Sequence, residues 1–223
     1  MFHALYDSTI RRRSTLQLMD STMPACFFID QIRSVTDTIT RNKFLRDGET
    51  IVSNGGIYAL GFFSPGNLEK RYVGIWYNKI QEQTVVWVAN RDKPINNSSS
   101  GIVNIDEKGN LAIFNGNSSS NYAIWVTNIL STISDNINSS TLFYKLLDSG
   151  NLVLCDENRG DFLWQSFDYP TDTYLPGMKI GWNWKAGLDW SFTSWKSPDD
   201  PSNGNYTFSM GRTGSQELFL KKA

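Results

Sequence analysis

Trp87-Val88-Ala89-Asn90 is repeated as Trp125-Val126-Thr127-Asn128 and, more loosely, as Trp164-Gln165-Ser166-Phe167, at intervals of roughly 40 residues. The first two tryptophans are each followed, at matching places, by a second shared phrase, Gly109-Asn110-Leu111 and Gly150-Asn151-Leu152. Small sheets of this size cannot bury their apolar faces alone. The repeat therefore predicts three similar β-rich units that pack around a shared aromatic centre.

Short apolar runs alternate with turn residues from about residue 44 onward. These runs are rich in aromatic and β-branched residues, and they span residues 57–63, 72–77, 84–88, 111–114, 142–147 and 152–154. The separators are Gly55-Gly56, Pro65-Gly66, Asn115-Gly116 and Ser149-Gly150, which suit tight turns. A propeller typically has at least four blades and a Trp-Asp signature. Three units favour an all-β, three-sided prism instead.

Composition excludes several classes of function. The chain has 223 residues, 40% of them hydrophobic, which is enough for a buried core. With 21 basic and 22 acidic residues, it has no electrostatic footprint for nucleic acid or for an anionic membrane. Its one histidine, His3, precedes the patterned region, so a Ser-His-Asp triad or a His-rich metal site is not expected. No cofactor is predicted.

The two cysteines do not indicate a disulfide framework or a metal site. Cys26 precedes the patterned region and Cys155 ends an apolar run, so neither a disulfide scaffold nor a metal-ligand pair is indicated. Because free cysteine is among the residues most often buried, we expect Cys155 to be a buried thiol.

The first 36 residues do not match a working leader. Arg11, Arg12 and Arg13 could open a signal peptide, but the apolar stretch at 25–29 is short and stops at Asp30. We expect residues 1–36 to be poorly ordered, with a defective signal region as one interpretation. No run approaches the ~18 to 20 apolar residues of a membrane span.

Five asparagines lie in N-glycosylation sequons within Ser/Asn/Gly-rich stretches, where an exposed loop tolerates an oligosaccharide. They are Asn96, Asn97, Asn117, Asn138 and Asn205. Such loops also generate sequons by chance, which remains the alternative.

After Trp164 the rhythm changes to proline-rich and tryptophan-rich sequence, which predicts a domain boundary near residues 168–175. Residues 168–223 are short for an independent core and are interpreted as the start of a further domain. Asp168, Asp172, Asp199 and Asp200 lie among the prolines, and they are better interpreted as turn formers than as a glycosidase pair.

Six phrases resemble the ectodomains of plant S-locus glycoproteins and the related G-type lectin receptor-like kinases. They are residues 61–66, 72–77, 86–92 (Val-Trp-Val-Ala-Asn-Arg-Asp), 147–154, 164–173 (Trp-Gln-Ser-Phe-Asp-Tyr-Pro-Thr-Asp-Thr) and 175–178. The resemblance implies a β-prism II, bulb-type lectin domain at 37–167, then the start of an S-locus glycoprotein domain at 168–223. It also implies an extracellular or cell-surface location. The kinase region of such receptors has no counterpart here, so we expect no enzyme activity.

Mannose-binding bulb lectins use a strand motif, Gln-x-Asp-x-Asn-x-Val-x-Tyr. Residues two apart point to the same face of a strand, so the polar groups converge on adjacent sugar hydroxyls while valine contacts the apolar side of the ring. The five motif places are Asp106, Lys108, Asn110, Ala112 and Phe114 in the first copy, and Leu147, Ser149, Asn151, Val153 and Cys155 in the second. Both copies are degenerate.

The candidate carbohydrate-binding residues are therefore Asp106, Asn110, Phe114, Asn151 and Val153. Each missing hydroxyl partner costs about 1 kcal/mol, whereas millimolar binding has only about 4 kcal/mol to lose. The alternative for Asn110 and Asn151 is turn chemistry beside a hairpin glycine.

The sequence supports two candidate functions about equally and disfavours a third. The first is recognition of mannose-type glycans, and the second is protein recognition on a lectin scaffold that has lost its sugar pockets, as in pollen or microbial recognition. An enzyme such as a glycoside hydrolase would require two carboxyls about 5 to 10 Å apart in a cleft. The partners implied are glycans or glycoproteins, a protein ligand or receptor partner, and a second copy in a homodimer.

Overall fold

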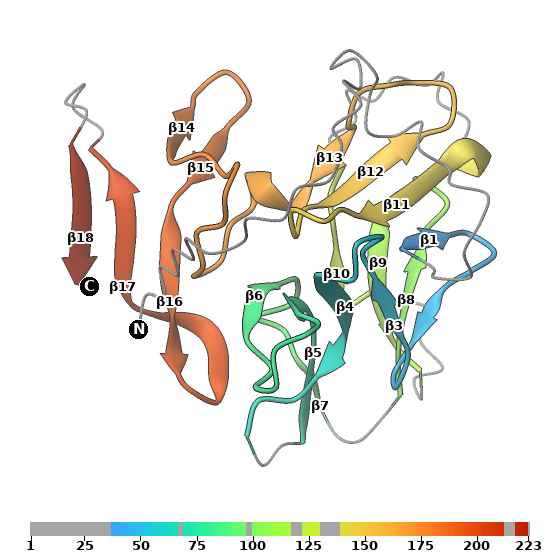
Figure 1. Ribbon diagram of the computed structural model, residues 1–223, viewed down its shortest axis with the longest axis horizontal. Coiled ribbons are helices and arrows are strands. Elements are labelled where there is room, and N and C mark those ends of the chain that lie inside the picture. Colours follow the sequence, from blue (N-terminus) through green and yellow to red (C-terminus); the bar gives the residue numbers. More distant parts are fainter. Residues whose placement is uncertain are drawn as a thin grey trace, which may run out of the picture.

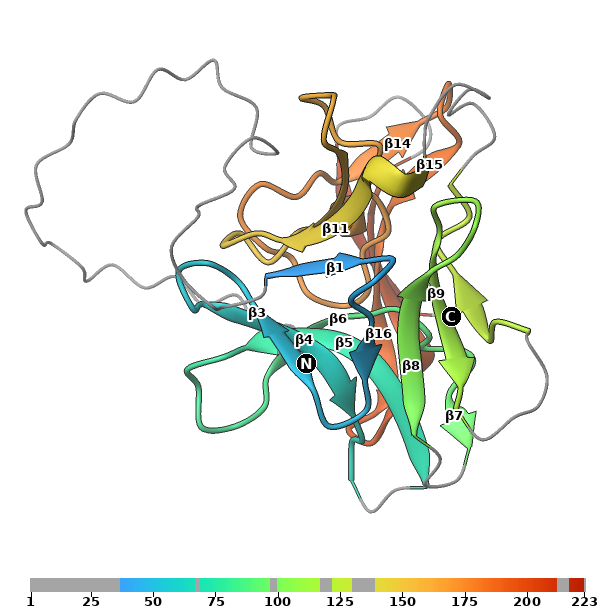
Figure 2. The same ribbon diagram turned by 90° about the vertical axis from the view of Figure 1, so that its right-hand side faces the viewer.

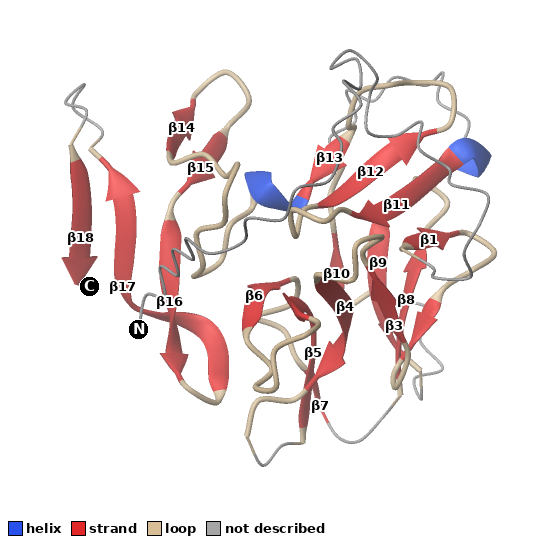
Figure 3. Cartoon of the chain, in the orientation of Figure 1, coloured by secondary structure: helices blue, strands red, loops and turns tan. Residues whose placement is uncertain are grey.

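The computed structural model describes residues 37–66, 69–96, 100–116, 122–129, 139–211 and 217–222. The predictions for residues 1–36 and for Asn97, Asn117 and Asn138 lie outside these ranges. Within them, the chain forms eighteen strands and two short 3-10 helices, so the predicted all-β class is confirmed (Figure 3).

Three antiparallel sheets form the body of the fold. The first has the order β1 (Thr38–Thr40), β11 (Leu142–Leu146), β12 (Leu152–Asp156), β13 (Trp164–Gln165). The second has the order β10 (Trp125–Val126), β9 (Leu111–Asn115), β8 (Gly101–Ile105), β2 (Leu45–Arg46). The third has the order β3 (Thr50–Val52), β4 (Tyr58–Phe63), β5 (Lys70–Tyr77), β6 (Val85–Val88), and β7 (Ile95–Asn96) also pairs with β5. A 3-10 turn, η2 (Ser139–Thr141), precedes β11.

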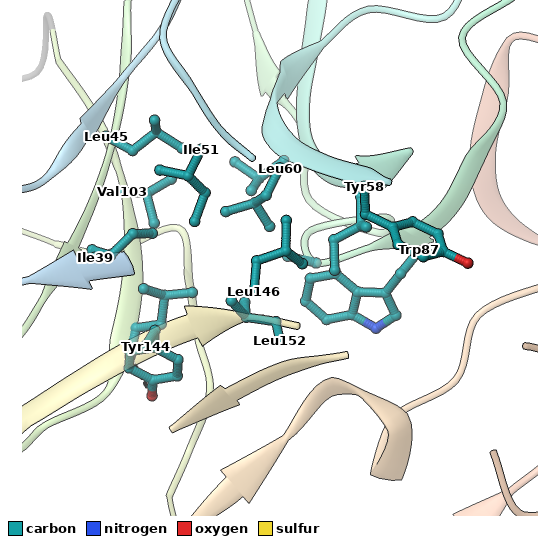
Figure 4. Close-up of a cluster of buried hydrophobic side chains, with 14 of the residues drawn as sticks. Ile39, Leu45, Ile51, Tyr58, Leu60, Trp87, Val103, Tyr144, Leu146 and Leu152 are labelled. Carbon is teal, nitrogen blue, oxygen red and sulfur yellow. Dashed lines mark hydrogen bonds between the residues drawn. The ribbon is translucent and has the colours of Figure 1, made fainter. Parts of the chain in front are cut away.

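The three sheets lie on three sides of one core, which confirms the predicted prism (Figure 2). Side chains from all three sheets, including Leu60, Val103 and Leu146, are fully buried and point toward one another (Figure 4). Period-2 alternation produces this arrangement, because alternate residues of each strand face inward.

The three repeated tryptophans occupy corresponding places, each on the last strand at one edge of its sheet. Trp87 packs edge-to-face against Trp125, with ring centroids 6.2 Å apart, and against Trp164, at 6.3 Å. Such T-shaped pairs suit the charge distribution of aromatic rings. The shared aromatic centre expected from the repeat is therefore present.

The glycine of the repeated Gly-Asn-Leu phrase is required by the backbone conformation of the hairpin. Gly109 and Gly150 sit in the hairpins before β9 and β12 with φ values of +87° and +83°, where other residues are strained. A Cβ at Gly109 would lie 2.5 Å from Leu142 Cδ1, so the leucine side chain would have to shift to admit it.

The chain after β13 lies beside the prism (Figure 1). The 3-10 turn η3 (Ser166–Asp168) leads to a hairpin of β14 (Gly181–Asn183) and β15 (Leu188–Trp190), then to a sheet of β16 (Phe192–Ser197), β17 (Asp200–Met210) and β18 (Leu218–Lys222). Leu175, Met178 and Phe192 belong to the same buried cluster as the prism side chains. The boundary at 167/168 remains a prediction, but the core itself continues past it.

One expectation for this fold was wrong. Cys155 on β12 is fully buried, as predicted, but it is disulfide-bonded and is not a free thiol. The other cysteine of the chain, Cys26, lies outside the described residues. The sequence patterning gave no sign of this bond, because Cys155 ends an apolar run and has no cysteine close to it in the sequence.

Candidate carbohydrate-binding sites

The first motif copy forms the loop between β8 and β9. Asp106 Oδ1 accepts hydrogen bonds from the backbone N–H of Lys108 and of Asn110, both at 2.8 Å. Asn110 Nδ2 donates to Asp106 Oδ2 at 3.0 Å, and Asn110 Oδ1 accepts from the N–H of Ile129 at 2.8 Å. The structure thus brings Asp106 and Asn110 together, but their polar groups close the hairpin and hold Ile129, which lies just after β10.

The second motif copy forms the corresponding loop between β11 and β12. Asn151 Nδ2 donates to Gln165 Oε1 at 2.9 Å. Its Oδ1 accepts from Ser166 Oγ at 3.1 Å and from the N–H of Phe167 at 3.2 Å. Asn151 is 5% exposed and Asn110 is 9% exposed, so both amides are engaged inside the protein.

The apolar motif places are equally enclosed. Ala112 and Val153, at the place of the sugar-facing valine, are fully buried. Val153 packs with Phe143 and Cys155 in a small cluster on the face of β11 and β12 opposite the main core. Phe114 is half-buried. At neither copy do the described side chains present the convergent, accessible polar groups that a sugar pocket requires.

The four aspartates near the prolines act as hydrogen-bond acceptors in the described fold. Asp168 accepts from Trp190 Nε1 and Gln165 Nε2, both at 2.9 Å, and Asp172 accepts from Trp195 Nε1 at 3.0 Å. Burial raises the pKa of Asp172, although the nearby Arg91 guanidinium opposes this shift.

Asp199 and Asp200 form local turns. Asp199 accepts from Ser197 Oγ, and Asp200 Oδ1 accepts from the N–H of Ser202 at 3.0 Å. The hydrogen bonds from Ser202 lower the pKa of the Asp200 carboxyl. Asp199 and Asp200 therefore form turns, as expected. Asp168 and Asp172 differ from that expectation, because each accepts a hydrogen bond from a tryptophan of a later strand and so joins distant parts of the chain.

A hollow of about 550 Å³ lies at the end of the prism where the three tryptophans meet. We call it the tryptophan-pole cleft, and its walls include Asp92, Trp125, Asn128, Asp168, Tyr169 and Asn203. These residues come from both the prism and the chain after β13, and no local motif joins them. Sequence reasoning missed the cleft for that reason, although the crowding of tryptophans and prolines after Trp164 marked the segment that builds one wall.

Among the described sequon asparagines, Asn96 on β7 and Asn205 on β17 are both exposed. Their side chains are accessible enough to carry an oligosaccharide. The described ranges contain no group of three or more His, Cys, Asp or Glu residues placed to bind a metal ion. They also contain no helix long and apolar enough to cross a membrane.

The three-sheet prism with a tryptophan at the end of each sheet defines a lectin-type module. The family model described as D-mannose binding lectin matches residues 84–196, which is 113 of the 223 residues and includes all three tryptophan strands. The chain belongs to the D-mannose binding lectin family.

Its relatives include plant receptor kinases, as the resemblance implied. The chain is 49% identical over 196 residues to the G-type lectin S-receptor-like serine/threonine-protein kinase RKS1 of Arabidopsis thaliana, covering 88% of this chain and 23% of that protein. It is 46% identical over 187 residues to the kinase At1g11410 of the same plant, covering 83% and 21%. The chain thus spans under a quarter of the length of these relatives.

Two solved lectins resemble the fold more distantly. A Marasmius oreades lectin covers 58% of this chain and 89% of its own, with 16% identity and a TM-score of 0.39. A monomeric monocot mannose-binding lectin from Gastrodia elata covers 58% and 94%, with 21% identity and a TM-score of 0.40. The fold description therefore depends on the sheet topology of this chain.

Proposed function

We propose that this chain is a carbohydrate-recognition module that binds mannose-type glycans as part of a plant receptor-like kinase ectodomain. The observation that carries the proposal is the D-mannose binding lectin match over residues 84–196, which includes β6, β10 and β13. The resemblance to S-locus glycoproteins extends the proposal to recognition of pollen or other extracellular signals. The module itself performs no chemistry on the glycan.

An extracellular location is part of the proposal. Disulfides persist in oxidising compartments, and Cys155 is disulfide-bonded. Asn96 and Asn205 are exposed sequon asparagines, and we propose that both carry N-glycans. The high identity to receptor kinases supports the same compartment, because the lectin region of a receptor faces its ligand.

The test is a calorimetric titration of the enzymatically deglycosylated protein with α-linked mannose oligosaccharides. Saturable heat with a dissociation constant near the millimolar range is expected, since one shallow site makes few desolvated contacts. Near-ultraviolet circular dichroism of the same sample establishes that the protein is folded. A folded protein that gives no heat at tens of millimolar sugar would contradict the proposal.

Protein recognition on the lectin scaffold is the second candidate function. It is favoured by one observation, namely that the polar side chains of both motif copies bond within the protein. It predicts no response to sugar in the titration above. Partners would then be glycoproteins recognised through their polypeptide, a receptor ectodomain, or a second copy of this chain.

The motif residues remain candidates for direct sugar contact, and Phe114→Ala tests them at an accessible position. If sugar binds on the β9 face, this variant should weaken binding about tenfold, because the half-buried ring is the largest side chain at the motif places of that copy. If sugar binds elsewhere, the variant should bind like the parent protein.

A further inference from the structure

We infer that the tryptophan-pole cleft is the site where this module binds a neutral, hydroxyl-rich oligosaccharide. The inference rests on the proposed function. It places sugar binding in the cleft, away from the residues of the strand motif. The residues that line the cleft come from the prism and from the chain after β13. These two parts of the chain lie side by side (Figure 1). Its volume of about 550 Å³ is within the range of small-ligand sites.

Hydrogen bonds fix the two walls of the cleft relative to each other. Trp87 Nε1 donates to the carbonyl oxygen of Tyr169 at 2.9 Å, which joins the aromatic centre to the loop after η3. Arg91, which follows β6, donates from Nε to the carbonyl of Pro201 at 2.7 Å and from Nη2 to that of Thr193 at 3.2 Å. A site held in this way needs little ordering when ligand binds, which favours affinity.

Aromatic rings supply a surface for the apolar face of a sugar. Tyr169 stacks on Trp164, with ring centroids 5.6 Å apart and planes inclined by 15°, yet it remains 42% exposed. Trp125 is half-buried and packs edge-on against Trp87. Both rings line the cleft and are held by a neighbouring ring, so each can offer a rigid apolar surface at low entropic cost.

The cleft offers sugar hydroxyls both carboxylate acceptors and amide groups that donate and accept. Asp92, Asn128 and Asn203 are exposed, and Asp168 is held by Gln165 and Trp190. Carboxylate and amide oxygens accept hydrogen bonds from sugar hydroxyls, and bonds to a charged group are the stronger ones.

Arg91 is the one basic residue among those that line the cleft, and its charge is not presented to a ligand. The buried guanidinium of Arg91 donates to three backbone carbonyls, those of Pro201, Thr193 and Ser194. The cleft should therefore accept neutral sugars and reject uronates or sialylated glycans, because like charges at close range are unfavourable.

One residue that lines the cleft, Asn128, has an unusual backbone conformation. Asn128 has a φ of +47° and is the one non-glycine residue with positive φ among those the structure describes. Asparagine tolerates this region better than most residues, but the conformation still costs free energy and is enriched at functional sites. Here it lies two residues after β10 and places an exposed amide at the cleft.

Two variants test the cleft in the calorimetric titration with α-linked mannose oligosaccharides. Tyr169→Ala removes the exposed ring, and Asn128→Gly removes the amide while keeping a residue that accepts positive φ. Each should raise the dissociation constant about tenfold, the loss typical of one stacking or hydrogen-bond contact. Circular dichroism and thermal unfolding confirm that each variant is folded.

Trp184→Ala is the matched aromatic control, because Trp184 is 75% exposed on the β14–β15 hairpin and does not line the cleft. It should bind sugar like the parent protein. If the parent binds sugar and both cleft variants bind equally well, the cleft inference fails while the proposed function stands. If the parent binds no sugar, the proposed function fails as well.

A comparison of neutral and charged ligands gives a second test of the cleft. A mannose oligosaccharide should produce saturable heat, and an oligogalacturonate of the same length should produce none at equal concentration and ionic strength. Binding of the uronate alone, or of a cationic peptide alone, would overturn the assignment to a neutral glycan.

Discussion

Asn110 and Asn151 occupy equivalent places in two of the three units, and each uses its amide to hold the segment that follows the strand with the repeated tryptophan. Asn110 binds the N–H of Ile129, and Asn151 binds the N–H of Phe167. A backbone N–H that loses its partner inside the fold is costly, so an asparagine at this place fixes the segment just after the edge strand that carries the repeated tryptophan. The residue type shared with the mannose motif thus has a structural use in this chain.

Asn151→Ala should destabilise the protein by about 2 to 3 kcal/mol, because it leaves Ser166 Oγ, Gln165 Oε1 and the N–H of Phe167 without this partner. Urea unfolding measures the change. Asn203→Ala is the control, since Asn203 is exposed on β17 and its loss should change stability by under about 0.5 kcal/mol. Equal midpoints for the two variants would contradict the structural role.

Buried tyrosines predict the response of the fold to alkaline pH. Burial raises the pKa of Tyr72 to about 12, with the charge of Asp200 adding to the shift, and burial also raises the pKa values of Tyr58 and Tyr144. The ordinary tyrosine pKa is about 10. The folded state therefore keeps protons that the unfolded state releases, so stability is fully present below about pH 10 and falls as pH rises through 12.

Urea midpoints measured at about pH 9 and pH 11 should show this loss, with tyrosinate absorbance reporting the ionisation. Tyr72→Phe should reduce the difference between the two pH values, because it removes one of the shifted groups. A parent protein with the same midpoint at both pH values would contradict the pKa shifts.

Residue identities were predictable only where a repeated pattern existed. The three tryptophans and the Gly-Asn-Leu phrases predicted the aromatic centre and the hairpins, because each unit must solve the same packing problem. The partners of Asn110 and Asn151 include backbone N–H groups, which have no sequence signature. The motif could therefore place these side chains on one face of a strand but could not show that they turn inward.

At the scale of elements, the hairpin between β11 and β12 depends on Gly150. Its φ is +83°, and a Cβ there would lie 2.9 Å from Leu175 Cδ1 and 3.0 Å from the Tyr58 ring. Gly150→Ala should cost about 2 to 3 kcal/mol through backbone strain and the clash together. Gly48→Ala measures the cost of backbone strain alone, because Gly48 has a φ of +89° and an added Cβ there would have no atom within 4 Å.

Thermal unfolding of both variants should therefore give a larger loss for Gly150→Ala than for Gly48→Ala. Equal losses would mean that the contact with Leu175 relaxes without cost. Leu175 follows β13 in the chain, so the comparison also measures how firmly the later segment packs on the hairpin.

The disulfide at β12 gives a test at the same scale. The protein purified without reductant should contain no titratable thiol after unfolding, because Cys155 is disulfide-bonded and the chain has two cysteines. Reduction should lower stability by about 2 to 4 kcal/mol, as for other long-loop disulfides. Detection of two thiols in the unreduced, unfolded protein would contradict the bond.

At the scale of the whole molecule, the buried core continues past the domain boundary that the sequence predicts, and the boundary itself remains a prediction. Composition predicted a change at 168–175, where prolines and tryptophans become frequent, and the sheets do change there. Burial could not be predicted from that pattern, because Leu175, Met178 and Phe192 lie in short segments without clear periodicity. The tryptophan-pole cleft was unpredictable for a related reason, since Asp92, Asn128 and Asn203 meet only after the two parts pack.

A shared core predicts that the described prism and the chain after β13 unfold together. Phe192 on β16 is almost fully buried within the main cluster, so Phe192→Ala should cost about 3 to 5 kcal/mol and lower the midpoint of one cooperative transition. Phe219→Ala is the matched control, because Phe219 lies exposed on β18 of the same sheet. Tryptophan fluorescence and far-ultraviolet circular dichroism should report coincident transitions in the parent protein. Two separated transitions, of which Phe192→Ala shifts only one, would show instead that residues 168–223 form an independent unit, and the tryptophan-pole cleft would then lie between parts that can separate.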